Sequence, residues 1–292
     1  MTTDIPSKQN SSLNKATQEE AELFKKWYLW LQNNMPSHFF NEVSNEHIML
    51  IVHNLMGLHL QDYFSQINLK SAAVVLCLDG PKADLRILKS YSEFGIKNYF
   101  CFVSKNPIND ELGIPLRIAL IYFTEALETV ETPLSIERKE ELKQLIKERN
   151  ASLTDEEFEN LMQGINRRFL DSWPLNRIAL ALDMFFRAQT RDNCQYEVFY
   201  DDNWEESANP SMHIVLAWRN TPKGKFLFRL AKTIFRNKLV MKRVNATYIN
   251  PYSKQSTLIM ALGLHGSDNQ PAWKAADIPT FLRELVNLKY FR

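Results

Sequence analysis

Two turns of similar sequence carry the residues best placed to bind a small ligand. Residues 78–84 read LDGPKAD and residues 219–225 read RNTPKGK, and each turn lies just before a predicted helix. The free N–H groups and the dipole of a helix N-terminus favour a carboxylate. The candidate ligand-binding residues are Asp79, Gly80, Lys82, Asn220, Lys223 and Gly224. Two interpretations stay open: a helix-capping turn with no further role, or an amino-acid site in which Asp79 or Asn220 accepts the ammonium group.

The second turn leads into a basic stretch, residues 223–243, which reads KGKFLFRLAKTIFRNKLVMKR. The whole chain is nearly neutral, with 35 Lys and Arg against 34 Asp and Glu, yet residues 207–267 contain no acidic residue. Helical spacing predicts that Phe226, Leu230 and Ile234 face a core, with the cations on the other side. The candidate interface residues are Lys225, Arg229, Lys232 and Arg236.

Three interpretations of this basic face compete. It is a solvated surface, or it contacts the Glu-rich residues 125–159 across a domain or subunit boundary, or it binds RNA. RNA-recognition domains bind through aromatic residues on their central strands. Because no run of the RNA-recognition consensus type occurs, we expect no nucleic-acid partner.

Residues for catalysis or metal binding do not form a recognisable motif. There is no GxSxG or HExxH, and the 8 glycines show neither dinucleotide-binding nor P-loop spacing. His47, His53 and His59 are six residues apart, so they drift around a helix and cannot share one metal. We therefore predict no catalytic residue, no metal site and no cofactor in this chain.

Composition indicates a cytoplasmic protein. The 3 cysteines are odd in number and lack CxxC spacing, which is typical of a reduced, intracellular chain. The start of the chain is polar, and no apolar run approaches the roughly 20 residues that span a bilayer. We expect no contact with a membrane.

Hydrophobic periodicity divides the chain into five parts. We predict a disordered tail (1–18), a helical segment (19–67), a first α+β unit (68–130), a helical connector (131–194) and a second α+β unit (195–292).

The two α+β units repeat the order β-α-β-β, and a closing helix follows in the second. The predicted strands are residues 71–79, 96–104 and 116–125 in the first unit and 212–219, 239–249 and 257–264 in the second. Pro81 aligns with Pro222, and Leu85 with Phe226, at the start of each helix. A parallel crossover with a third strand between predicts a ferredoxin-like sheet with helices on one face. A fourth strand is not evident in either copy; residues 194–202, CQYEVFYDD, or a neighbouring copy would supply it.

The strand–(D/N)xP(x)G–helix–strand pattern resembles the ACT domain, a regulatory ferredoxin-like module that often binds amino acids between paired copies. LCLDGPKADLRILKSYSEFGIKNY is the better match. WYLWLQNNMPSHFF, HNLMGLHLQDYFSQI, KNYFCFVS and IPTFLRELVNLKYF resemble the N-terminal region of the large NAD-specific glutamate dehydrogenases, over most of residues 24–292.

The resemblance implies two ACT-like units with helical segments before and between them, acting in oligomer assembly and allosteric control. It implies a fragment of a larger enzyme, whose catalytic core lies beyond this chain, uses NAD and oxidatively deaminates L-glutamate to 2-oxoglutarate. The implied partners are other copies of the chain, that core and an amino-acid effector. Nothing here matches the glutamate-binding or dinucleotide-binding lobes, so the chain alone should not turn over glutamate. The alternative is a free-standing ACT-like amino-acid sensor or adaptor.

Overall fold

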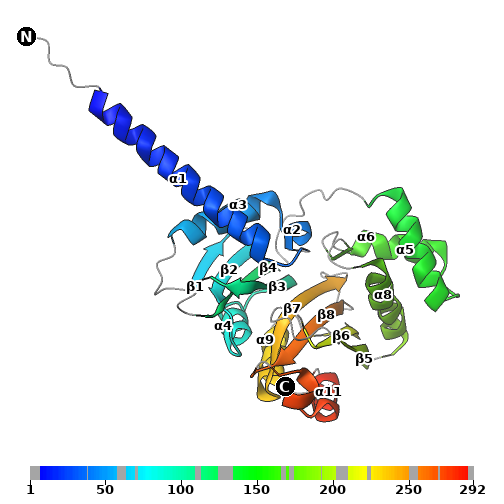
Figure 1. Cartoon of the computed structure of the whole chain (residues 1–292). Coiled ribbons are helices and arrows are strands. Elements are labelled where there is room, and N and C mark those ends of the chain that lie inside the picture. Colours follow the sequence, from blue (N-terminus) through cyan, green and yellow to red (C-terminus); the bar gives the residue numbers. More distant parts are fainter. Residues whose placement is uncertain are drawn as a thin grey trace, which may run out of the picture.

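A computed structural model of the chain describes residues 7–37, 39–57, 64–69, 72–108, 113–123, 134–165, 169–170, 174–191, 193–201, 210–221, 225–249, 256–268 and 270–288. Within these residues, eight strands form one antiparallel sheet in the order β1-β2-β4-β3-β7-β8-β6-β5 (Figure 1). The strands are β1 (Phe64–Asn68), β2 (Ala72–Leu78), β3 (Ile96–Pro107), β4 (Pro115–Phe123), β5 (Gln195–Tyr200), β6 (Met212–Arg219), β7 (Leu239–Ile249) and β8 (Thr257–Gly266).

The sheet is made of two halves with the same internal order. The first half runs β1-β2-β4-β3 and the second runs β5-β6-β8-β7, and β3 pairs with β7 to join them. A helix lies between the second and third strands of each half: α4 (Ala83–Ser90) in the first and α9 (Phe226–Arg236) in the second. The predicted strands are confirmed, and β5 confirms that CQYEVFYDD supplies a fourth strand.

The junction between the halves is close to two-fold symmetric. Each junction strand carries a register shift near its start, at Lys97 in β3 and at Lys242 in β7. Three residues beyond these shifts, Phe100 and Asn245 lie opposite each other in the β3–β7 pair. The two halves therefore meet through equivalent strand edges, in equivalent register.

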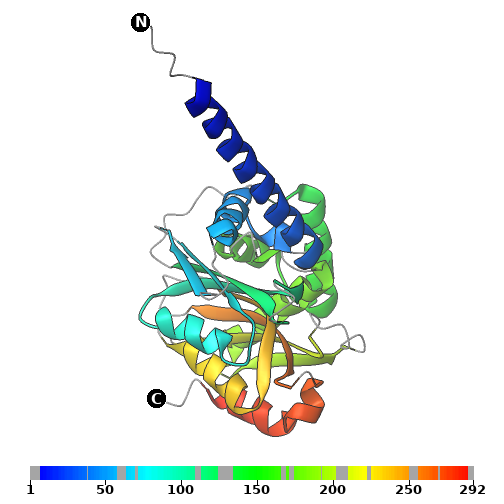
Figure 2. The same ribbon diagram turned by 60° about the vertical axis from the view of Figure 1, so that its left-hand side comes forward.

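Helices cover both faces of the sheet (Figure 2). On one face α4, α9 and α11 (Ile278–Asn287) pack on a shared core. The other face is covered by α1 (Ser7–Asn34) and α3 (Asn45–Gly57) over the first half, and by α8 (Leu175–Thr190) over the second. The prediction of helices on one face is wrong, because β2 and β8 are apolar on both sides and both sides must be covered.

Further helices complete the outer layers. They are α2 (Phe39–Glu42), α5 (Ile136–Arg149), α6 (Asp155–Gly164) and α10 (Ala272–Ala275). A capping box starts α6, in which Thr154 and Glu157 satisfy each other's backbone N–H groups. Among the described residues, no helix combines the length and apolar character needed to cross a membrane.

Two predictions at the N-terminus need correction. A helix, α1, begins at Ser7 in place of the tail predicted to be disordered through residue 18; residues 1–6 lie outside the described part of the chain. The helix predicted to reach Ile67 ends at Gly57, and Phe64–Asn68 is the edge strand β1. Backbone pairing with β2 decides this, because FSQIN gains a ladder of inter-strand hydrogen bonds there.

We expect Gly266→Ala to destabilise the fold by roughly 1–3 kcal/mol. A Cβ at this last residue of β8 would lie 2.5 Å from the Gln270 carbonyl oxygen and 2.6 Å from the Ala275 Cβ, so the backbone must shift. Gly57→Ala is the matched control, because no atom lies within 4 Å of its added Cβ. Urea unfolding followed by circular dichroism compares the two. Equal midpoints for both variants would contradict the expectation.

Candidate functional site

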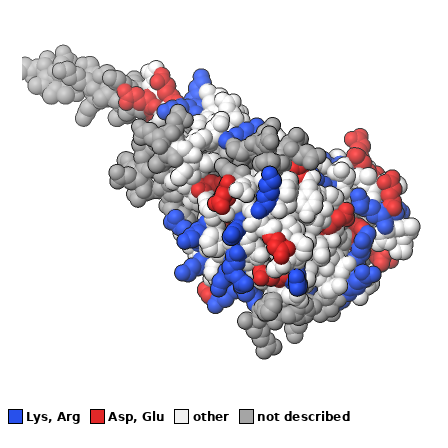
Figure 3. Space-filling model, turned by 60° about the horizontal axis from the view of Figure 1, so that its bottom comes forward, with Lys and Arg blue, Asp and Glu red and all other residues white. Residues whose placement is uncertain are grey.

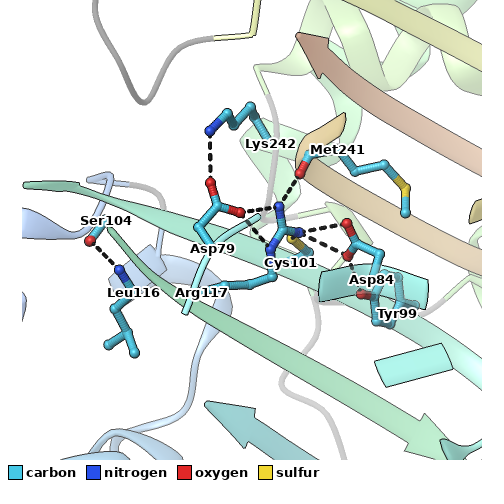
Figure 4. Close-up of polar contacts among 9 residues, drawn as sticks. All are labelled: Asp79, Asp84, Tyr99, Cys101, Ser104, Leu116, Arg117, Met241 and Lys242. Carbon is cyan, nitrogen blue, oxygen red and sulfur yellow. Dashed lines mark hydrogen bonds and ion pairs between the residues drawn. The ribbon is translucent and has the colours of Figure 1, made fainter. Parts of the chain in front are cut away.

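A network of buried charges lies at the junction of the two halves (Figure 4). Its centre is Arg117 in β4, whose side chain is 0% exposed. Arg117 Nη1 donates to both carboxylate oxygens of Asp84 at 2.8 Å. Arg117 Nε and Nη2 donate to Asp79 Oδ1 at 2.9 and 2.6 Å. One guanidinium group thus holds two carboxylates of the first half.

The second half of the sheet contributes the other side of the network. Lys242 Nζ donates to Asp79 Oδ2 at 2.8 Å, and Arg117 Nη2 also donates to the Met241 carbonyl oxygen. Lys242 sits at the register shift of β7, and its side chain is 7% exposed. Two cations and two carboxylates balance each other, and their hydrogen bonds cross the β3–β7 junction.

Local structure explains where each carboxylate lies. Asp79 follows β2, and its N–H donates to the Pro115 carbonyl oxygen at 2.8 Å. Asp84 lies in the first turn of α4, where the helix dipole favours a negative charge. Tyr99 Oη in β3 donates to Asp84 Oδ1 at 2.7 Å. The turn and the helix start therefore bring both carboxylates over the same strand.

The protonation states of the network are those of a structural cluster. Burial acts to raise the pKa of Asp79, but Arg117 and Lys242 outweigh it and lower that pKa from 3.8 to about 2. Burial raises the pKa of Asp84, opposed by Arg117 and Tyr99, and burial also raises the pKa of the Cys101 thiol. A carboxylate this acidic is a poor general base near pH 7, and a neutral buried thiol is a poor nucleophile.

The first predicted ligand turn is occupied by this network. Both carboxylate oxygens of Asp79 already accept hydrogen bonds, so its side chain is not free to hold an ammonium group. Gly80 is half-buried in the turn that follows. Lys82 is exposed, and its Nζ lies 5.9 Å from the centroid of the Phe235 ring in α9.

The second turn differs from the first in its chemistry. Asn220 matches Asp79, since its N–H donates to the Ser256 carbonyl oxygen at 2.9 Å, but the side chain is exposed and φ is 57°. Lys223 and Gly224 lie outside the described residues. The position equivalent to Arg117 is Leu258, opposite Trp218. The second half thus replaces the charge network with apolar packing, in which Trp218 meets Phe226 edge-on at 5.4 Å.

The predicted basic face is formed as expected on α9. Phe226, Leu230 and Ile234 are buried, which confirms the apolar side of the helix. On the other side, Lys225 Nζ lies 2.9 Å from Glu93 and Arg236 lies 3.5 Å from Glu284. The remaining two candidate interface residues, Arg229 and Lys232, are half-buried and exposed, respectively.

A contact between α9 and the Glu-rich segment does not form within one chain. The described part of that segment, α5 and α6, packs with α8 on the opposite face of the sheet from α9. Glu125, Glu128 and Glu131 lie outside the described residues. The intramolecular version of the prediction is therefore wrong for α5 and α6, and the version between subunits stays a prediction.

No family model matches the chain, and no curated protein matches it significantly. Within the described ranges, no group of three His, Cys, Asp or Glu residues could hold a metal ion.

A shallow pocket of about 260 Å³ lies beside α3 and β1, lined by His53, Asn54, Gly57 and Ser65. Ser65 Oγ donates to Asn54 Oδ1 at 2.7 Å there, and this pair alone offers no recognisable chemistry.

Sequence reasoning missed Arg117 and Lys242. Arg117 is the single charged residue in the apolar strand LRIALIYF. A buried strand tolerates a charge only if that charge is paired, so this residue was the available signal. Lys242 lies in a stretch with many Lys and Arg residues, and the sequence does not distinguish it from the others. Its role depends on the register shift of β7, which composition does not reveal.

Proposed function

We propose that the chain is the N-terminal regulatory and assembly region of a large, cytoplasmic NAD-dependent glutamate dehydrogenase. The catalytic core, beyond this chain, binds NAD and oxidatively deaminates L-glutamate to 2-oxoglutarate. The observation that carries the proposal is the repeated strand order, in which β2 and β3 flank β4 and β6 and β7 flank β8. Since both flanking strands run antiparallel to the strand between them, each half contains a split β-α-β unit.

Each half accordingly fits an ACT-like unit with a rearranged edge strand. In each half, an edge strand pairs with the first strand of the β-α-β unit. This edge strand, β1 or β5, precedes the β-α-β unit in the sequence. In the second half, α11 follows β8 and packs beside α9 on the same face, as a second helix of such a unit would. The expected binding mode is an amino acid held between paired units, with the chain as a regulatory partner of its core.

The free-standing amino-acid sensor or adaptor stays as the second candidate. One observation favours it: the paired arrangement of two units is already complete within one chain, through β3 and β7. The reading frame that encodes the chain discriminates between the two candidates. A frame that continues into a glutamate-binding lobe and a dinucleotide-binding lobe supports the dehydrogenase, and a frame that ends at Arg292 supports the sensor.

We expect an amino acid to raise the melting temperature of the chain by binding at the second turn, where Asn220, Lys223 and Gly224 lie. The first turn contributes Gly80 and Lys82, but its Asp79 is engaged in the network. A ligand at 100 times its Kd stabilises the fold by about 2.7 kcal/mol. Titration of the common amino acids in a thermal-shift assay measures this, with NAD reduction by glutamate as a parallel assay in which we expect no turnover.

Asn220→Ala should abolish the thermal shift, whereas Asp268→Ala, at another exposed turn, should leave it intact. If no amino acid raises the melting temperature at concentrations of a few millimolar, neither turn is a ligand site. Regulation would then depend on assembly alone.

A further inference from the structure

Helix α5 separates its charges by sign. Its sequence, IERKEELKQLIKER, alternates acids and bases, but its three lysines turn towards α6, and Arg149 is exposed in the last turn. Lys139 Nζ lies 2.5 Å from Glu159, and Lys143 and Lys147 lie 3.1 and 2.8 Å from Asp155. The exposed side of the helix is left with a row of carboxylates, which we call the acidic stripe: Glu137, Glu140, Glu141 and Glu148.

Helix α9, together with the residue just before it, carries a row of opposite charge. Its basic stripe comprises Lys225, Arg229, Lys232 and Arg236. Within the helix, Arg229, Lys232 and Arg236 are spaced by three and four residues, as are Glu141, Gln144 and Glu148 in α5; Lys225 is the left-handed residue just before α9. Such steps keep side chains on one side of a helix. Seven residues of α-helix rise about 10 Å, so the stretch from Arg229 to Arg236 has the same length as that from Glu141 to Glu148.

The neighbourhood of α9 adds further positive charge. Lys82, Arg86 and Lys89 are exposed along α4, which packs directly beside α9. Figure 3 shows Lys and Arg side chains gathered on the left of the underside of the molecule, on the side of these helices. Glu93 and Glu284 pair with Lys225 and Arg236, and leave a clear excess of cations on this surface.

We propose that the basic stripe of α9 in one copy of the chain binds the acidic stripe of α5 in another copy. The inference rests on the assembly role proposed above and names the two surfaces that carry it. Complementary charges fix the partner, because potentials of opposite sign attract and align while like charges repel. Within one chain the stripes lie on opposite faces of the sheet and cannot meet.

The placement of the stripes also sets the symmetry of the assembly. A two-fold dimer uses one self-complementary patch, whereas two patches on opposite faces generate a head-to-tail contact. Each copy then presents one acidic stripe and one basic stripe to two different neighbours. Association therefore continues beyond two copies or closes into a ring. Exposed ion pairs are screened within about 10 Å at 0.1 M salt, so the assembly should dissociate as salt rises.

Sedimentation velocity of the full chain at low salt tests the proposal, with two charge-reversed variants. Lys232→Glu/Arg236→Glu cancels the net positive charge of the basic stripe, and Glu137→Lys/Glu141→Lys cancels the net negative charge of the acidic stripe. We expect each variant alone to associate at least about tenfold more weakly than the unmodified chain, because the attraction between the two stripes is lost. A mixture of the two variants restores one complementary contact, between the intact acidic stripe of the first variant and the intact basic stripe of the second, and should recover a species of two copies.

The matched control for the first variant is Lys25→Glu/Lys274→Glu, which lowers the net charge by the same amount at exposed positions in α1 and α10. It should associate as the unmodified chain does, and circular dichroism checks that all variants are folded. A chain that stays monomeric at low salt overturns the inference. So does an oligomer that both variants leave unchanged, or a mixture that stays dissociated. Amino-acid binding in the thermal-shift assay is a separate readout, so its survival would leave the proposed function standing.

Discussion

Arg117→Met should lower the free energy of unfolding by about 3–5 kcal/mol, the typical loss when one partner of a buried ion pair is removed. The substitution leaves Asp79, Asp84 and Lys242 buried with one negative charge in excess. The carbonyl oxygen of Met241 also loses the donor that reaches it from the other half of the sheet. Urea unfolding at pH 7, followed by tryptophan fluorescence and circular dichroism, measures the change.

The double variant Arg117→Met/Asp84→Asn separates lost charge balance from lost packing. It removes one charge of each sign and keeps an acceptor for Tyr99, so it should be more stable than Arg117→Met alone. Arg283→Met, at an exposed position in α11, should change stability by less than about 0.5 kcal/mol. If Arg117→Met were as mild as Arg283→Met, the network would not contribute to the fold.

Asp79→Asn should cost stability at neutral pH, and the cost should disappear in acid. The pKa of Asp79 is lowered from 3.8 to about 2 in the folded chain, which corresponds to about 2 kcal/mol. A lowered carboxyl pKa contributes stability that is present above the unfolded value and lost as pH falls through the folded value. The difference between the unmodified chain and Asp79→Asn should therefore be full above about pH 5 and shrink between about pH 4 and pH 2.

Comparison with the variant isolates Asp79 from the other groups that titrate in acid. Burial raises the pKa of Asp84, so that group acts in the opposite direction, and it is present in both proteins. Asp268→Asn, at an exposed turn, is the control and should show no such pH window. A stability difference for Asp79→Asn that stays constant from pH 7 to pH 2 would contradict the assignment.

The sequence predicted the strands best where apolar runs are bounded by clear turn signals. Residues 212–219 and 239–249 match β6 and β7 at both ends. It failed for β1, because FSQIN has little intrinsic strand character and is held by its pairing with β2. The second helical layer was also missed, since an apolar run shows that a strand is buried but not which elements cover it.

The candidate site was located only in part. The turn around Asp79 was singled out for its polar residue before a helix, and that residue is indeed engaged in strong interactions. Its partners were beyond reach, because Arg117 and Lys242 lie far along the chain and meet Asp79 only through strand order and the register shift of β7. The inward turn of the α5 lysines depends in the same way on the position of α6.

The pairing of β3 with β7 has a consequence for synthesis of the chain on the ribosome. Roughly 130 residues separate the end of β3 from the start of β7. At a synthesis rate of about 5–20 residues per second, the edge of β3 that pairs with β7 stays unpaired for on the order of ten seconds. During that time the apolar run YFCFV is open to pairing with other nascent chains. Lys97 and Lys105 flank this run, and charges in such places discourage aggregation of an edge that is exposed for a time.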